Sequence, residues 1–272
     1  MRRCSKPDDD PPWRLHMRLT VLGGSAASPN TGMGCAGFLV ESAGARFVLD
    51  LGPGTLPELR KHADFQTLDA VILSHMHLDH ALDLLALRHA LAYNPIPAPR
   101  PVPVWLPPGG AKLLAAATAP FDACDVPGRF TATVQVAEYD PLRPLTIGDA
   151  TVTFAPAVHY LPAWAMRVHA PGSGDLGYTG DTGPTADLAP FFHSVTVLIA
   201  EATLVEAGEG PISVRGSLTA AEAGRLASEA RAKTLLLTHY WEEMGVEIVQ
   251  ERAAARFAGR LVMARPGLVI DL

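Results

Sequence analysis

A run of seven residues, Ser74-His75-Met76-His77-Leu78-Asp79-His80, constrains this chain more than any other segment. It places three imidazoles and one carboxylate directly after the apolar stretch 69–73. Because residues two apart in an extended segment point the same way, His75 and His77 can bind one metal ion. Asp79 and His80 follow the bend into a helix, where their side chains can face a second ion. The spacing predicts a strand that ends at a site for two metals.

Three single residues further along the chain have the same setting. His159, Asp181 and His239 each end an apolar run and begin a loop. Taken singly, each is an ordinary polar residue at the end of a strand. Taken with the first run, they favour a shared metal site, because histidine clusters of tags and solvated loops do not follow buried strands.

Strand-like and helical runs alternate along the rest of the chain. Strands are expected where apolar runs are bounded by Gly, Pro and Asn, and helices where apolar residues recur every three or four positions. The pattern Thr219-Ala-Ala-Glu222 is a capping box that begins one helix. Both halves contain strands followed by helices, so we expect an α/β fold of two packed sheets with helices outside. The expected strands are 19–22, 37–41, 46–51, 70–74, 130–137, 150–157, 165–170, 176–179, 195–200, 234–238 and two closing strands, and the expected helices are 79–91, 186–192, one behind the capping box and one over about 244–257.

A proline-rich segment, 94–108, separates the first long helix from the second half. Its alternate prolines, from Pro95 to Pro103, exclude a helix and a central strand. We expect an extended surface loop that leads into an edge strand.

The first sixteen residues differ from the rest. They combine charges and prolines without the apolar stretch of a signal peptide, so we interpret 1–16 as a disordered extension or cloning remnant and 17–272 as a single domain. Cys4, Cys35 and Cys124 are too scattered for a disulfide framework, which favours a reducing compartment. With no apolar run of the roughly 18 residues that span a membrane, we expect a soluble cytoplasmic protein without a membrane partner.

The charge balance bears on the partner. The 272 residues include 28 acidic and 22 basic side chains, a formal net charge of −6. Binding of long nucleic acids depends on a dense basic surface that releases counterions from many phosphates. The chain is therefore expected not to bind long nucleic acid.

The run from His75 to His80 resembles the His-x-His-x-Asp-His motif of the metallo-β-lactamase fold hydrolases. The three later residues match that family's ligand positions in order and spacing, and the resemblance covers essentially 17–272. It implies a four-layer αβ/βα sandwich with the site between two sheet edges. Carried over by position, it implies one metal held by His75, His77 and His159, a second held by Asp79, His80 and His239, and Asp181 as the bridge between them.

Three more segments are similar to the subgroup of this family that contains ribonuclease Z and cyclic-nucleotide phosphodiesterases. They are Leu49-Asp50-Leu51-Gly52-Pro53-Gly54, Gly177-Tyr178-Thr179-Gly180-Asp181 and Ala200-Glu201-Ala202-Thr203. The resemblance implies two divalent ions bridged by a hydroxide, a nucleophile at neutral pH that Asp79 orients. Five imidazoles and two carboxylates favour zinc, with manganese or iron as alternatives. Asp50 either accepts the N–H of a ligand histidine or caps a turn.

The chain departs from these relatives where the leaving group is protonated. They commonly carry a histidine just before the helix that precedes the last ligand, and this chain has Ser217 there. Serine is a poor general acid near pH 7, so that contribution to catalysis, about 10²- to 10⁴-fold, is missing or comes from another group. Glu201, the expected partner of that histidine, is left without it. We expect a preference for good leaving groups; alternatively, Ser217 only helps to cap a helix.

Aromatic residues next to the ligand positions are candidates for substrate binding. Tyr160, Trp164, Tyr240 and Trp241 either line a pocket for a flat group or pack in the core. Arg215 either meets a phosphate or lies free on the surface. Asp181 lies only 22 positions after His159. This spacing leaves no room for the tRNA-gripping arm of ribonuclease Z.

The residues therefore favour a metal-dependent phosphodiesterase for small diesters such as cyclic nucleotides, whose partner is a small molecule. Two alternatives stay open: a lactonase, β-lactamase or thioesterase of the same fold, and a catalytically weak metal-binding protein. A homodimer is compatible with each of them.

Overall fold

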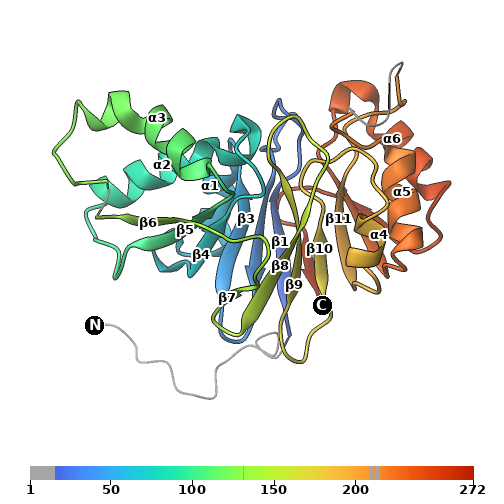
Figure 1. Ribbon diagram of the computed structural model, residues 1–272, viewed down its shortest axis with the longest axis horizontal. Coiled ribbons are helices and arrows are strands. Elements are labelled where there is room, and N and C mark those ends of the chain that lie inside the picture. The colour runs from blue at the N-terminus through green and yellow to red at the C-terminus, as the bar shows by residue number, and fades with distance from the viewer. Residues whose placement is uncertain (1–15, 131, 209–210, 212–214) are drawn as a thin grey trace.

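Two seven-stranded sheets face each other, and helices cover their outer faces (Figure 1). The computed structural model describes residues 16–130, 132–208, 211 and 215–272. All of the expected N-terminal extension except His16 lies outside these residues. The arrangement of helix, sheet, sheet and helix confirms the expected αβ/βα sandwich.

The first sheet has the strand order β14-β1-β2-β3-β4-β5-β6. Strands β3 to β6 are parallel, and β1, β2 and β14 are joined antiparallel. Helices α1, α2 and α3 lie on its outer side (Figure 1). The elements are β1 Arg18–Gly23, β2 Gly37–Glu41, β3 Arg46–Leu51, α1 Thr55–His62, the 3₁₀ turn Phe65–Thr67, β4 Ala70–Ile72, α2 Leu78–Tyr93, β5 Val102–Leu106, α3 Gly110–Asp122, β6 Val134–Glu138 and β14 Val269–Asp271.

The second sheet has the strand order β13-β12-β11-β10-β9-β8-β7. Its strands β10 to β13 are parallel, and α4, α5 and α6 lie on its outer side (Figure 1). The elements are β7 Leu145–Ile147, β8 Ala150–Pro156, β9 Trp164–His169, β10 Leu176–Tyr178, α4 Leu188–Phe191, β11 Val197–Glu201, α5 Ala220–Glu229, β12 Thr234–Thr238, the 3₁₀ turn Glu242–Met244, α6 Val246–Ala254 and β13 Arg260–Met263.

The core between the sheets is apolar and joins them directly. Phe38 on β2 and Tyr178 on β10 are buried and meet edge to face, with ring centroids 5.1 Å apart. Such aromatic pairs contribute about 0.5–1.5 kcal/mol beyond the apolar area that they bury. Residues Leu59, Leu84 and Leu87 belong to a second buried cluster, between the first sheet and its helices.

Strand β5 corrects the expectation for the proline-rich segment. It lies inside the first sheet, between β4 and β6, although it contains Pro103. Val102 donates its backbone N–H to the carbonyl of Thr133, on the side of β6. Because the backbone groups of successive strand residues point to opposite neighbours, the backbone of Pro103 faces β4. The paired residues of β4 and β5 begin only at Val71 and Val104. Pro103 therefore stands just before that ladder, where its missing N–H costs no bond.

The helices predicted from the spacing of apolar residues agree only in part with the structure. The capping box of α5 is confirmed, because Thr219 and Glu222 each accept from the other's backbone N–H. Helix α2 covers the predicted range 79–91 and extends it to Leu78–Tyr93, and α6 is shorter than predicted. Helices α1 and α3 were not predicted, and β6 begins at Val134 rather than at 130. Among the described residues, no helix is both long enough and apolar enough to span a membrane.

Candidate metal centre

Seven histidine and aspartate side chains converge where the parallel strands of both sheets end. They form two groups of four, and in each group the potential ligand atoms all lie within 4.8 Å of one another. Asp181 belongs to both groups, so the groups form one continuous cluster. The first group is His75, His77, His159 and Asp181, and the second is Asp79, His80, Asp181 and His239.

The secondary structure explains this convergence. His75 and His77 lie between β4 and α2, and Asp79 and His80 occupy the first turn of α2. The other three ligands come from the second sheet, in the loops that follow β8, β10 and β12. Because carboxyl ends of parallel strands meet at one edge of a sheet, the two sheets bring their loops to the same place.

Asp50 orients His80. Its Oδ2 accepts a hydrogen bond from Nδ1 of His80 at 2.7 Å, and the Tyr178 hydroxyl donates to the same oxygen at 2.5 Å. The backbone N–H of Ser74 donates to Oδ1 at 2.6 Å. Since Nδ1 of His80 donates to Asp50, Nε2 is the ring nitrogen that faces the cluster. Asp50 has a φ of 56°, a left-handed conformation that these bonds hold.

His159 and His239 are oriented in the same way by other acceptors. Nδ1 of His159 donates to the backbone carbonyl of Gly216 at 2.6 Å. Nδ1 of His239 lies 2.7 Å from the hydroxyl of Thr203, which in turn donates to the carboxylate of Glu201. In both histidines Nε2 is the atom left for a metal.

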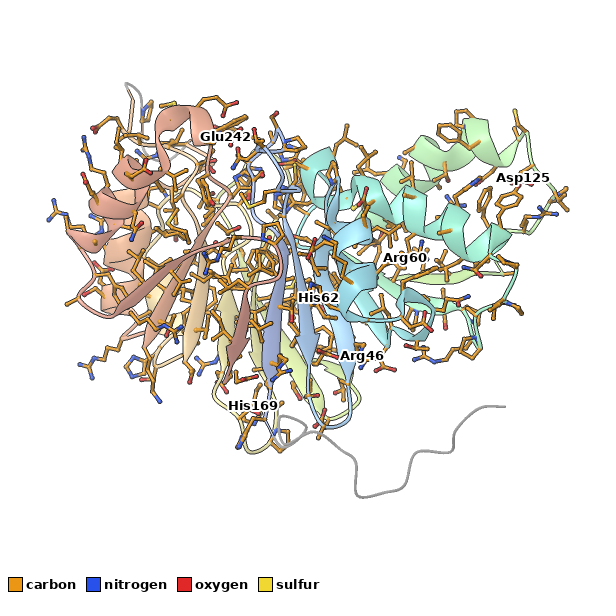
Figure 2. The ribbon with its side chains drawn as sticks, turned by 180° about the vertical axis from the view of Figure 1, so that it is seen from behind. Arg46, Arg60, His62, Asp125, His169 and Glu242 are labelled. Carbon is orange, nitrogen blue, oxygen red and sulfur yellow. The ribbon has the colours of Figure 1, made fainter. Side chains whose placement is uncertain are left out.

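The loop that follows β1 in the first sheet forms a backbone hydrogen bond with His239. The N–H of His239, whose φ is 55°, donates to the carbonyl of Gly24 at 2.6 Å. Glu242 accepts two bonds from Thr31 of the same loop, at 2.9 and 2.7 Å. Figure 2 shows Glu242 beside this loop. The position of His239 therefore depends on contacts with the first sheet.

The cluster fits divalent cations. Nε2 of His80 and Oδ1 of Asp181 are buried and lie 3.3 Å apart, and neither makes a hydrogen bond of good geometry to another described residue. Nδ1 of His77 lies 3.1 Å from Nε2 of His75 and 2.9 Å from Nε2 of His159. Nδ1 of His159 already donates its proton elsewhere, so these nitrogens converge as acceptors. Converging lone pairs on buried side chains are the donor set that a cation satisfies.

The charges within the cluster support the ionised carboxylates that metal binding requires. Burial alone would raise the pKa of Asp181, but His239 and His80 hold it well below its usual value. Burial alone would lower the pKa of His80, but Asp181 and Asp50 raise it well above its usual value. Burial and the nearby Asp181 raise the pKa of Glu201 to about 8.

Three other predicted site residues, Glu201, Ser217 and Tyr160, differ in how deeply they are buried. Glu201 is buried and has partners, because its carboxylate accepts from the N–H of Thr182 at 2.6 Å and from Thr203. Ser217 is buried and directly follows Gly216, whose carbonyl accepts the hydrogen bond from His159. Tyr160 follows a ligand histidine and is 71% exposed.

Two of the proposed substrate-binding residues, Tyr240 and Arg215, have contacts elsewhere, and the two tryptophans are half-buried. Tyr240 packs in the core and donates its hydroxyl proton to the carbonyl of Ala264 at 2.8 Å. The guanidinium of Arg215 forms an ion pair with Glu222, so it is not the free surface arginine that the sequence suggested as one alternative. Trp164 is half-buried, and its indole N–H is buried without a partner. Trp241 is half-buried as well and precedes the 3₁₀ turn before α6.

Two of the groups that support the ligands could not be predicted from residue types. Thr203 lies in a segment that the family resemblance quotes, but nothing in its residue type marks it as the acceptor for His239. The carbonyl of Gly216 has no sequence signal at all, because every residue carries a carbonyl. Only the structure shows that these groups orient His159 and His239.

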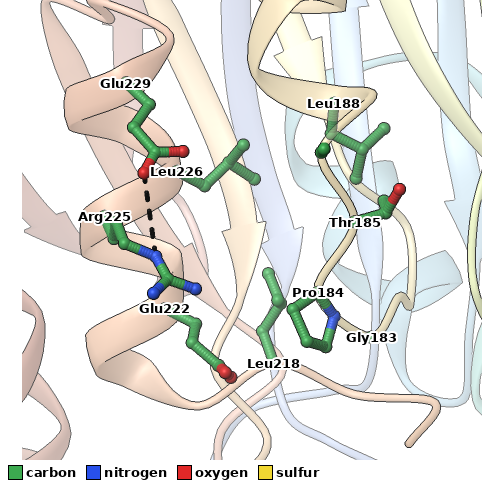
Figure 3. Close-up of a pocket in the computed structure, with 10 residues that line it drawn as sticks. Gly183, Pro184, Thr185, Leu188, Leu218, Glu222, Arg225, Leu226 and Glu229 are labelled. Atoms are coloured by element: carbon green, nitrogen blue, oxygen red, sulfur yellow. Dashed lines mark ion pairs between the residues drawn. The ribbon is translucent and has the colours of Figure 1, made fainter. Parts of the chain in front are cut away.

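A separate cavity of about 370 Å³ lies between α4 and α5 (Figure 3). Pro184, Leu188, Leu218 and Leu226 form much of its apolar lining. Arg225 and Glu229 face each other across 3.8 Å at its edge. None of the seven candidate ligands lines this cavity.

The fold and the shared histidine and aspartate cluster together define a metal-binding protein of the metallo-β-lactamase fold. A family model described as "Beta-lactamase superfamily domain" matches residues 45–240. The chain belongs to this superfamily of metallohydrolases.

Two relatives show how far the similarity extends. The chain is 31% identical over 255 residues to the probable metallo-hydrolase YhfI of Bacillus subtilis, which covers 93% of this chain and 99% of the relative. It is 26% identical to a ribonuclease Z of Bradyrhizobium diazoefficiens, over 90% of this chain and 97% of the relative.

Solved structures show the same fold. The crystal structure of YhfI from Bacillus subtilis aligns with a TM-score of 0.79 and 28% identity, over 94% of this chain and all of that one. The structure of a diphosphatase from the PhnP family aligns with a TM-score of 0.73 and 18% identity, over 94% and 98%. The second likeness supports the fold alone.

Proposed function

We propose that this protein is a two-metal phosphodiesterase for small phosphodiesters of the cyclic-nucleotide kind. The observation that carries the proposal is that Asp181 belongs to both ligand groups. A carboxylate has two oxygens and can therefore contact two ions at once. Such a paired site suits the displacement of one phosphate oxygen by another, because it can stabilise both the attacking and the leaving oxygen.

The relatives support phosphate esters as the substrate class. One relative, 26% identical over 90% of this chain, is a ribonuclease Z. The net charge of −6 argues against a long polyanion, whereas two bound cations would supply the local positive charge that a small diester needs.

The residues that would hold the ions are the two groups that share Asp181, and zinc suits their five imidazoles and two carboxylates. When bound, such ions lower the pKa of coordinated water and neutralise charge on a phosphoryl oxygen. The chain's own contribution is orientation. Asp50, Thr203 and the Gly216 carbonyl hold the Nδ1 side of three ligand histidines, so that their Nε2 atoms face one place.

A second candidate function is the hydrolysis of C–O, C–N or C–S bonds. The observation that favours it is the name of the matched family model, which refers to β-lactamases. The test compares bis-(p-nitrophenyl) phosphate, a lactone and a cephalosporin. The full chain is stripped with a chelator and then reloaded with zinc or with manganese.

We expect turnover of the diester only after reloading, and a loss of at least 100-fold in Asp181→Asn. Lys112→Gln, which changes a charge outside the cluster, serves as the control and is expected to keep full activity. Faster turnover of the lactone or the cephalosporin would overturn the phosphodiesterase assignment. Stoichiometric metal without turnover of any of the three would leave a metal-binding protein.

A further inference from the structure

An aromatic side chain lies uncovered beside the metal cluster. Tyr160 directly follows the ligand His159 and keeps 71% of its surface exposed. The two ring centroids are 5.1 Å apart, at an interplanar angle of 51°. In the first half of the chain, Leu78 lies between the ligands His77 and Asp79 and is 67% exposed. The cluster therefore carries an exposed apolar side chain next to its ligands in each half of the molecule.

The loop that carries Tyr160 is fixed at its base. Ala157 and Ala163 close it with a backbone hydrogen bond of 3.0 Å. Between them, Val158 accepts the N–H of Gly183 at 2.6 Å and donates its own N–H to Thr182 at 3.1 Å. These partners follow Asp181 directly, so the loop is attached to the segment that carries the shared ligand. A loop held in this way loses little backbone freedom when it binds a ligand.

The ring of Tyr160 lies directly against the backbone of Gly216. A Cβ atom at position 216 would lie 2.7 to 2.9 Å from three ring carbons of Tyr160, closer than real Cβ contacts allow. Any side chain at 216 would therefore displace the ring. The carbonyl of the same Gly216 accepts from His159, so one residue seats both the metal ligand and the tyrosine next to it.

We propose that Tyr160, seated on Gly216, is a stacking platform for the nucleobase of a nucleoside phosphate whose phosphate lies at the metal cluster. An exposed phenol ring that lies against Gly216 offers a flat face of the kind on which bases stack. Among the aromatic candidates for substrate binding, Tyr240 packs in the core, and Trp164 and Trp241 are half-buried. Tyr160 is the exposed one of the four. The proposal rests on the proposed phosphodiesterase function for the position of the phosphate.

The experiment compares two ligands that differ only in the base. Binding of adenosine 5′-monophosphate and of ribose 5-phosphate to the zinc-loaded full chain is measured by titration calorimetry. The base should tighten binding by about 5- to 150-fold, the range of base stacking on aromatic residues. In Tyr160→Ala the ratio of the two affinities should fall to near one, and in Tyr160→Phe it should stay close to that of the parent.

Two further variants separate stacking from general disturbance. Gly216→Ala keeps the backbone carbonyl but pushes the ring away, so it should reduce the ratio as well. Tyr93→Ala removes another exposed tyrosine, at the far end of α2, and should leave the ratio unchanged.

An unchanged ratio in Tyr160→Ala, or equal affinities of the two ligands for the parent protein, would overturn the platform. Failure of the proposed function looks different. In that case the base still tightens binding through Tyr160, but the metal-loaded protein does not hydrolyse 3′,5′-cyclic adenosine monophosphate. The calorimetry therefore tests the platform even if turnover is absent.

Discussion

At the residue scale, Asp50 shows how much of the centre depends on groups that do not bind metal. It is fully buried and accepts four hydrogen bonds, two from Ser74 and one each from His80 and Tyr178. This pattern agrees with one of the two roles that its position before the glycines allowed, an acceptor for a ligand histidine.

Asp50→Asn tests this role. An amide can offer His80 only one oxygen, and its NH₂ group faces donors, so we expect zinc affinity to fall about 10- to 100-fold. Competition with a chromophoric chelator measures the affinity, and circular dichroism checks that the fold is kept. Asp140→Asn, at an exposed carboxylate paired with Arg143, is the matched control. Equal affinities of the parent and Asp50→Asn would contradict the role.

Ser217 carries a second prediction. Ser217→His introduces an imidazole where relatives of this kind carry their general acid, so it should raise turnover of alkyl diesters by up to about 100-fold. Diesters with p-nitrophenol as the leaving group need no proton donor and should change little. Steady-state rates on both substrates measure the effect. An equal effect on both would refute the assignment of position 217.

Most of the ligand set could be predicted from residue types, and its supports could not. Imidazoles and carboxylates at strand ends carry their chemistry in their side chains, which is why the sequence pointed to all seven. The carbonyl of Gly216 acts through backbone that any residue has. Tyr240 stands at a similar place in the chain to Tyr160, yet only tertiary packing decides that one is buried and the other exposed.

At the element scale, the misjudged strand and the missed helices have a common cause. The proline-rich segment contains a central strand because Pro103 stands where the neighbouring ladder has not begun. Helix α3 begins after Gly109, which has a left-handed φ of 85° and no side chain that could cap the helix. The helix also contains Pro120. Local signals argue against both elements, and packing on the first sheet overrides them.

The contact between the turn after β3 and the start of α2 gives a prediction at this scale. A Cβ atom at Gly52 would lie 1.9 Å from the carbonyl oxygen of Asp79, which is backbone and cannot move aside. Gly52→Ala should therefore lower the free energy of unfolding by about 3 kcal/mol or more.

Gly109→Ala is the matched control for this prediction. Position 109 has open space around it but a left-handed φ of 85°, so alanine there should cost only about 1 kcal/mol. Urea unfolding of both variants measures the difference. A similar loss in the two would show that the close approach at Gly52 does not matter.

At the scale of the whole molecule, the cluster links the two sheets. Four ligands come from the segment after β4 that runs into the first turn of α2, and three come from loops of the second sheet. Bound metal should therefore stabilise the complete sandwich, by about 4 kcal/mol for a site filled at 1,000 times its Kd. Whether residues 17–272 act as one domain remains a prediction, and this linkage favours it.

Removal of metal tests the linkage. We expect a chelator to lower the urea midpoint of the zinc-loaded chain, and re-addition of zinc to restore it. His159→Ala, which removes one ligand of the second sheet, should reduce the gain, whereas His193→Ala, outside the cluster, should keep it. A midpoint that does not respond to zinc would contradict the idea that the ions join the two sheets.

The central claim is that two ions share Asp181, and anomalous diffraction from crystals of the zinc-loaded chain tests it most directly. The account predicts two strong anomalous peaks per chain, one within each four-residue group, with an oxygen of Asp181 bound to each. A single peak, or two peaks of which one does not contact Asp181, would contradict it.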